Sequence, residues 1–214
     1  MNSALTIVAA TAAAAALVAS ASAVEPVRAA ANPLGLGANQ QTGTFGDPVA
    51  AAPFWRLQHS SDCGEMAVAD VVGQITGTEP TERKITSLAR TTSGVTGAGP
   101  IYRRRSGTDI RNLPVLLAHY GIQSSLAESN LGGLEQDLAQ GRKVIAAVNA
   151  QTIWNTLGDR ATDNHVVVVT GIDPHAGVVH VNDSGIKSGR DERVSLATFE
   201  KSWATSQDLA VVTN

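Results

Sequence analysis

Hydrophobic residues recur with a helical period in the first half of the chain. Val68, Val71, Val72 and Ile75 follow one another at three- and four-residue spacing, which predicts an amphipathic helix that Gly77 can end. The same kind of spacing predicts three more helices, which begin at Pro80, near Asn112 and near Leu131, the last two ending at Gly121 and Gly141.

The pattern changes after Lys143. Four β-branched runs of strand length follow: KVIAAVNA at 143–150, HVVVVTGI at 165–172, GVVHVND at 177–183 and DLAVVT at 208–213. Between the last two, LATFEKSW at 196–203 has helical spacing. Helices first and an antiparallel sheet afterwards predict an α+β domain.

The N-terminal segment suggests that the chain is exported and that its first residues are removed. Residues 1–23 are small and apolar and end in Ala21-Ser22-Ala23, as in a signal peptide, although no Lys or Arg precedes the apolar stretch. An uncleaved membrane anchor is the alternative. The composition of residues 24–52 predicts a flexible linker or short pro-segment, and we expect the folded domain to cover residues 53–214. We therefore expect a protein that is secreted or held in the cell envelope.

Composition narrows the classes of partner. The net charge of −3 offers no basic surface for nucleic acid or anionic lipid, and the run Arg103-Arg104-Arg105 is typical of a solvated loop. No HxxxH or HExxH spacing occurs, so we expect neither a metal nor another cofactor. We expect no stable membrane domain after signal cleavage, and the sequence leaves the oligomeric state open.

The chain has a single cysteine, Cys63, at the start of the first predicted helix. Asp62 and Glu65 have the spacing of a capping box, and a helix N-terminus favours a thiolate over a thiol. A lone thiol cannot form a disulfide within the chain and is a liability in an exported protein. Cys63 is therefore a candidate nucleophile, with a small buried hydrophobe as the alternative.

A hairpin over 165–183 supplies a candidate base for this thiol. Pairing Gly171 with Gly177 would place His165 opposite residue 183, where Asp183 could hold one ring nitrogen while the other takes a proton. Asn182 is the rival orienting residue, because a slip of one residue exchanges their faces. A purely structural role for His165 also remains open. The chain's other histidines, in a loop, on a helix, at a turn tip and within a strand, are less suited: His59, His119, His175 and His180.

Acyl transfer also needs donors for a developing oxyanion. The backbone N–H of Cys63 is one, and the side-chain amide of Gln58, five residues earlier, could be the second. A solvated loop glutamine is the alternative.

The order Gln58, DCGEMA at 62–67, NHVVVVTGID at 164–173 and HVNDSG at 180–185 resembles the papain-like cysteine peptidases of the bacteriocin-processing, double-glycine-leader type, above all their exported stand-alone relatives. The resemblance covers about residues 55–203. It implies a papain-like fold with the nucleophile helix packed on the sheet, and it assigns Cys63 as nucleophile, His165 as base, Asp183 as orienting acid and Gln58 as oxyanion donor.

This chain departs from that pattern in two respects. Ser184 stands where the family commonly has proline, and the sequence has no Walker-type nucleotide loop. We therefore expect an exported cysteine hydrolase that cleaves a peptide or amide bond of a peptide or protein substrate through an acyl-thioester on Cys63. An acyl transferase with the same residues, or a papain-like binding module without turnover, is the alternative.

Overall fold

The computed structural model describes residues 43–214. The expected signal peptide and residues 24–42 of the expected linker lie outside the described residues. The helices are α1 (Pro48–Ala51), α2 (Cys63–Thr76), α3 (Glu82–Thr91), α4 (Leu113–His119), α5 (Leu131–Ala139), α6 (Ala150–Ile153) and α7 (Leu196–Trp203). The strands are β1 (Phe45–Gly46), β2 (Ser124–Glu128), β3 (Val144–Val148), β4 (His165–Asp173), β5 (Val178–Asn182), β6 (Glu192–Ser195) and β7 (Leu209–Thr213).

The helices and strands expected from the hydrophobic pattern are confirmed, with small shifts of their ends. The helix expected at Pro80 begins at Glu82, because the Thr81 side chain accepts a hydrogen bond from the backbone N–H of Lys84 and caps it. Strands β2 and β6 were not expected. Both are short and carry mostly polar residues, and β2 pairs only with β7, so tertiary pairing rather than apolar alternation makes them strands.

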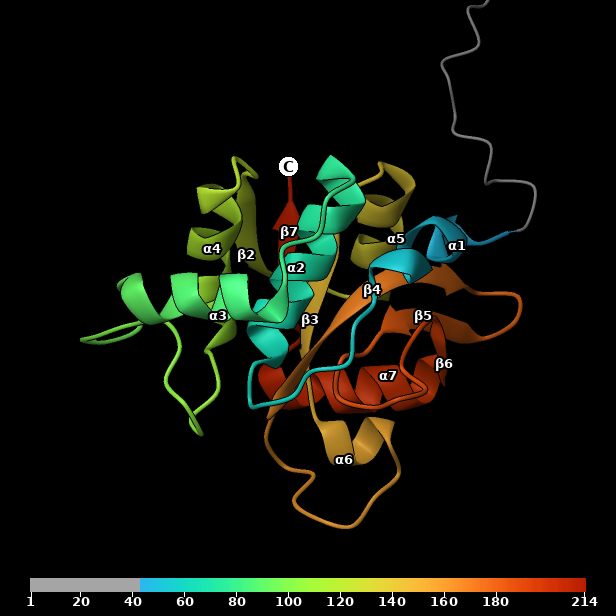
Figure 1. Ribbon diagram of the computed structural model, residues 1–214. Coiled ribbons are helices and arrows are strands. Elements are labelled where there is room, and N and C mark those ends of the chain that lie inside the picture. Colours follow the sequence, from blue (N-terminus) through green and yellow to red (C-terminus); the bar gives the residue numbers. More distant parts are fainter. Residues whose placement is uncertain (1–42) are drawn as a thin grey trace, which may run out of the picture. The chain divides into compact units, whose positions relative to one another are not determined.

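The strands form one antiparallel sheet in the order β2-β7-β3-β4-β5-β6, with β1 added beside β4. One apolar cluster packs α2, α3 and α4 against one face, and a second packs α5 and α7 against the other (Figure 1). In β4, Val166 and Val168 enter the first cluster while Val167 and Val169 enter the second. Burial on both faces explains the unbroken run of valines. The mixed helix and antiparallel-sheet class is confirmed.

The register expected for the β4–β5 hairpin is wrong. Gly171 pairs with His180 instead of Gly177, Val168 pairs with Asn182, and a bulge lies between Val169 and Gly171. A longer turn, in which Asp173 caps the N–H of Ala176, together with the bulge, moves the pairing away from the tight-turn arrangement. Asp183 therefore lies beyond the end of β5, outside the ladder.

Part of the expected linker is folded. Phe45 pairs with Ile172 of β4, and Asp47 caps α1 by accepting from the N–H of Ala50. Pro48 lies so close to Gly171 that a Cβ on that glycine would come within 2.6 Å of its ring. Regular secondary structure is thus present before residue 53. None of the helices in the described part is long and apolar enough to cross a membrane.

Candidate active site

Cys63 is the first residue of α2 and is partly buried against the cluster formed by α2, α3 and α4. The expected capping box is wrong. Asp62 occupies the cap position with backbone angles outside the extended region, and its carboxylate caps no N–H of the helix. Glu65 turns inward and is fully buried. Neither expected carboxylate therefore accepts a hydrogen bond from the backbone N–H groups of the first turn.

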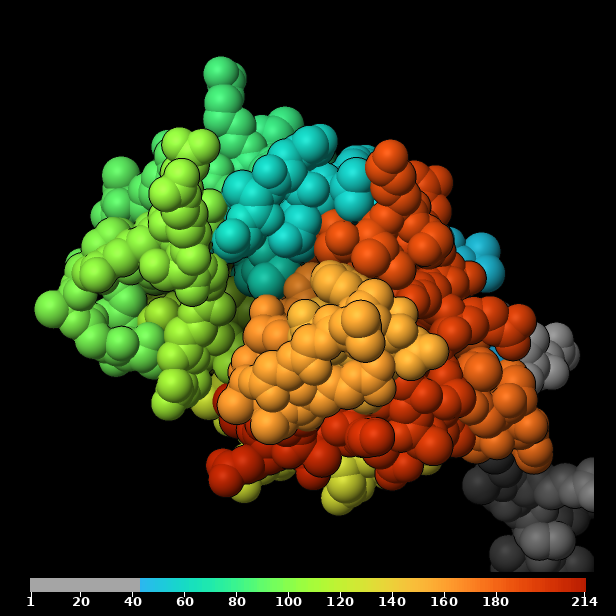
Figure 2. Space-filling model, turned by 90° about the horizontal axis from the view of Figure 1, so that it is seen from below, coloured from blue at the N-terminus to red at the C-terminus, as the bar shows by residue number. Residues whose placement is uncertain are grey.

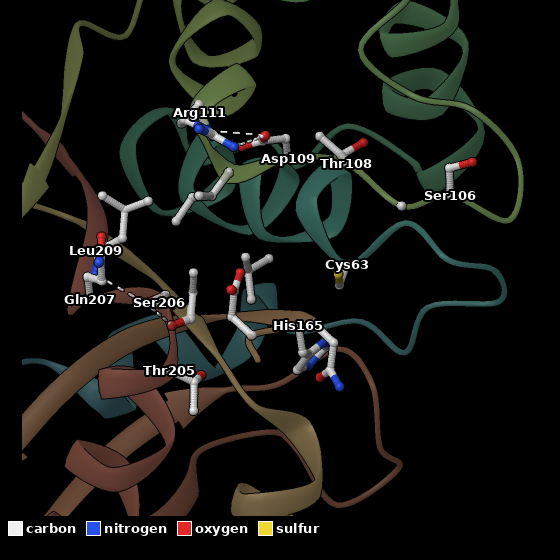
Figure 3. Close-up of a pocket in the computed structure, with 16 residues that line it drawn as sticks. Cys63, Ser106, Thr108, Asp109, Arg111, His165, Thr205, Ser206, Gln207 and Leu209 are labelled. Carbon is white, nitrogen blue, oxygen red and sulfur yellow. Dashed lines mark hydrogen bonds and ion pairs between the residues drawn. The ribbon is translucent and has the colours of Figure 1, made fainter. Parts of the chain in front are cut away.

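The sulfur of Cys63 and the ring of His165 point into one cleft of about 630 Å³ (Figure 3). Residues 106–111, which include the end of the glycine-rich loop at 93–108, form one wall, and Thr205, Ser206, Gln207 and Leu209 form another. On the surface viewed from below, this green loop and the orange connection between β3 and β4 lie on either side of the hollow (Figure 2).

His165 is buried at the start of β4 and binds Asp183 through its Nε2 atom, 2.7 Å from Oδ1. This arrangement leaves Nδ1 as the nitrogen available to the thiol. Burial opposes a charge on the ring, but hydrogen bonds with Asp183 and Cys63 and the charges of both outweigh burial and raise the pKa of His165 to about 10. The site thus favours an imidazolium beside the sulfur.

Asp183 is fully buried, yet its carboxylate is well supplied with donors. Oδ1 accepts from His165 and from the N–H of Gly185 at 2.7 Å, and Oδ2 accepts from the indole N–H of Trp154 at 2.7 Å. Burial alone would raise the pKa of Asp183, but these bonds and the charge of His165 lower it below its ordinary value. Asp183 therefore stays ionised and fixes the ring of His165.

Trp154 was not identified from the sequence. Its ring lies 5.2 Å from the ring of His165, centroid to centroid, and a Cβ at Gly185 would come within 2.5 Å of it. The indole therefore packs beside the ring of His165 and donates to the carboxylate of Asp183. Tryptophan is rare in this chain, which has three, and that rarity was the one signal that could have drawn attention to Trp154. Its spacing along the sequence does not point to a site.

Asn182, the rival orienting residue, does not contact His165. Its side-chain amide donates to Oδ2 of Asp70 on α2 at 2.8 Å and to the carbonyl of Ala51 at 3.1 Å. Its oxygen accepts from the N–H of Asp191. Asn182 therefore ties the nucleophile helix to the sheet, while Asp183 faces the histidine.

Gln58 lies in the loop that leads to α2. Its Nε2 donates to the carbonyl of Ser60 at 2.8 Å, and its Oε1 accepts from the hydroxyl of Ser184 at 2.8 Å. Its backbone N–H also donates to the carbonyl of Ser184 at 2.9 Å. Two hydrogen bonds thus hold the side chain, which is half-buried and does not line the cleft that Cys63 and His165 share.

A buried carboxyl group connects α2 to the cleft wall. Thr108, which lines the cleft, donates from its hydroxyl to Oε1 of Glu65 at 2.6 Å. Burial raises the pKa of Glu65 to about 7, and the bond from Thr108 offsets only part of that effect. A Cβ at Gly64 would lie 3.2 Å from Cβ of Thr108, so the wall packs directly on the first turn of the helix.

The site thus combines the thiol of Cys63, the imidazole of His165, which can accept the thiol proton, and the carboxylate of Asp183, which orients the imidazole. Such a set can attack a carbonyl carbon and form an acyl-thioester. Within residues 43–214, no cluster of three or more His, Cys, Asp or Glu side chains could hold a metal ion.

Known proteins resemble this chain in sequence and in fold. Residues 52–211 match the model of the Peptidase C39 like family. Two uncharacterized proteins, from Mycobacterium bovis and Mycobacterium tuberculosis, are each 40% identical over 203 residues, a match covering 82% of this chain and 87% of each relative.

Two solved structures share the fold. A candidate C39-like peptidase from Bacillus anthracis superposes with a TM-score of 0.59 at 18% identity, covering 78% of this chain and 96% of that one. The peptidase domain of Streptococcus ComA, a bifunctional ABC transporter of a quorum-sensing pathway, gives 0.53 at 18% identity, covering 74% and 96%. The papain-like fold expected from the sequence is confirmed.

Proposed function

Because the chain belongs to the Peptidase C39-like family, we propose that it is a cysteine peptidase that hydrolyses a peptide or amide bond through an acyl-thioester on Cys63. The observation that carries the proposal is the buried pair of His165 and Asp183, whose ring faces the same cleft as the only thiol of the chain. A spent binding scaffold would not need a buried ion pair with every carboxylate oxygen satisfied.

In the proposed reaction, His165 takes the proton of the Cys63 thiol and Asp183 stabilises the resulting imidazolium. The thiolate attacks the carbonyl carbon, and the oxyanion is met by the N–H of Cys63 and the side chain of Gln58. His165 then gives the proton to the leaving amine, and water resolves the thioester. An amine in place of water would make the same machinery an acyl transferase.

The setting of the reaction also belongs to the proposal. The small-x-small end of the apolar stretch at residues 21–23 supports export, so that the substrate would be a peptide or protein of the cell envelope or the medium. Because Cys63 is the chain's only thiol, no second cysteine is present to form a disulfide with it in that compartment.

The test compares the full chain with its Cys63→Ala and His165→Ala variants. New peptide N-termini in a mixture of denatured secreted proteins, read by mass spectrometry, should appear with the native chain and with neither variant. Iodoacetamide should label Cys63 of the native chain at about pH 6, where a free thiol is largely protonated, and His165→Ala should slow that labelling.

Urea unfolding of the same samples supplies the control. Cys63→Ala should change the free energy of unfolding by less than about 1 kcal/mol, because the side chain is only partly buried. New termini produced equally by Cys63→Ala would contradict the proposal, and so would labelling of Cys63 that His165→Ala leaves unchanged. Products extended by an added amine, instead of ended by water, would show acyl transfer.

A further inference from the structure

The loop that carries Gln58 is fastened to the segment that carries Asp183. The indole N–H of Trp55 donates to the carbonyl of Asp183 at 2.5 Å, and the N–H of Gln58 donates to the carbonyl of Ser184 at 2.9 Å. A third bond joins two side chains, from the Ser184 hydroxyl to Oε1 of Gln58 at 2.8 Å. Ser184 is 8% exposed, so solvent competes little for that bond.

These contacts fix which end of the Gln58 amide faces which way. The carbonyl of Ser60 can only accept, so the nitrogen of Gln58 must face it and the oxygen must face Ser184. The opposite orientation would set two carbonyl oxygens against each other. An amide nitrogen carries two protons, and only one is used by Ser60. Among the described residues, the second has no acceptor.

We propose that Ser184 is a positioning residue that acts through Gln58, holding its amide oxygen so that its N–H is aimed at the oxyanion. The inference rests on the proposed function. It gives a separate task to each of two neighbours: Asp183 orients the base, and Ser184 orients the oxyanion donor. Preorganised donors are effective because they need not turn when charge develops.

Two reagents separate these tasks on the full chain. Iodoacetamide alkylates a thiolate by displacement at carbon and forms no oxyanion, so its rate reports the thiolate alone. p-Nitrophenyl acetate is attacked at its carbonyl carbon, where an S–C bond forms and the C–O bond to p-nitrophenolate breaks, with a tetrahedral oxyanion between them. Water then releases acetate and restores the thiol. The ratio of acylation rate to alkylation rate therefore isolates the oxyanion donors.

Ser184→Ala should lower the single-turnover acylation rate by about 10-fold and Gln58→Ala by about 100-fold, since removing one oxyanion donor typically costs 10²–10³-fold. Neither should change the alkylation rate at about pH 6. If Ser184 acts through Gln58, the double variant should acylate no more slowly than Gln58→Ala alone. Ser125→Ala, the same substitution at an exposed position of β2, is the matched control and should change neither rate.

Three results would overturn the inference: acylation by Ser184→Ala at the native rate, effects of the two substitutions that multiply, or slower alkylation by Ser184→Ala, which would place its action on the histidine pair. If Ser184→Ala does not fold by circular dichroism, Ser184→Gly removes the same hydroxyl together with the Cβ. Acylation of the native chain that persists in Cys63→Ala would instead overturn the proposed function together with the inference.

Discussion

At the scale of single residues, the site separates two adjacent side chains that the sequence could not. Asp183 binds His165, whereas Asn182 binds Asp70 on α2 and leaves the histidine alone. The expected hairpin register is wrong, yet the expected partner of His165 is the one found. Asp183 reaches the ring because it lies past the last ladder pair, where its direction is not set by strand alternation.

This division predicts different damage from neighbouring substitutions. Asp183→Ala should lower kcat by about 100-fold or more with a smaller effect on KM, because the carboxylate stabilises the imidazolium formed in the transition state. Asn182→Ala should instead lower the free energy of unfolding, by about 1–3 kcal/mol, since it leaves the buried carboxylate of Asp70 short of a donor. Peptide hydrolysis and urea unfolding of both variants check this, and the reverse pattern would contradict it.

At the scale of elements, the nucleophile helix α2 is held from two sides. Asp70 connects it to the end of β5 through Asn182, and Glu65 connects it to the glycine-rich loop through Thr108. The glycine-rich loop covers residues 93–108. Its end at 106–108 packs against the first turn of α2, which fits a wall.

Removing the loop's anchor tests this connection. Thr108→Val keeps the shape of the side chain but leaves the buried Glu65 without its hydrogen bond, and should cost about 1–3 kcal/mol of unfolding free energy. Urea unfolding measures the loss. Thr156→Val, at an exposed position of the connection between α6 and β4, is the matched control and should change the stability by less than about 0.5 kcal/mol. Equal stability of the two variants would show that the bond does not hold the loop.

At the scale of the whole molecule, buried carboxyl groups set the dependence of stability on pH. Burial raises the pKa of Glu65, Glu79 and Glu192 to about 7 and that of Asp70 to about 6. A group with a raised pKa binds more protons in the folded state, so stability falls as pH rises from the unfolded pKa to the folded one. The raised pKa of His165 acts in the same direction above about pH 6.5.

The free energy of unfolding should therefore be higher near pH 5 than near pH 8, in contrast to a protein whose carboxyl groups are mainly paired and lose stability in acid. Glu65→Gln should reduce the difference by about 3 kcal/mol, the equivalent of raising a pKa from 4.5 to about 7. Glu135→Gln on α5, which has no ion pair in the described structure, is the control. A urea midpoint that is as high at pH 8 as at pH 5 would contradict this prediction.

The sequence alone determined the features that depend on neighbours along the chain. Helical period, β-branched runs and turn residues predicted the main helices and four strands, and the lone Cys63 at a helix start marked the site. His165 and Asp183 were found because a hairpin brings them together under several registers. Each of these signals lies within a short stretch of the chain, so the sequence alone contains it.

Only the tertiary structure decided which partners meet across long separations. The bulge in β4, the inward turn of Glu65 and the bond of Trp154 to Asp183 each depend on residues far away in the sequence, and no local spacing encodes them. Strands β2 and β6 form because other strands lie beside them. The hydroxyl of Ser184 donates to Gln58, which lies 126 residues away in the sequence, and only the packing of the folded chain brings the two side chains together.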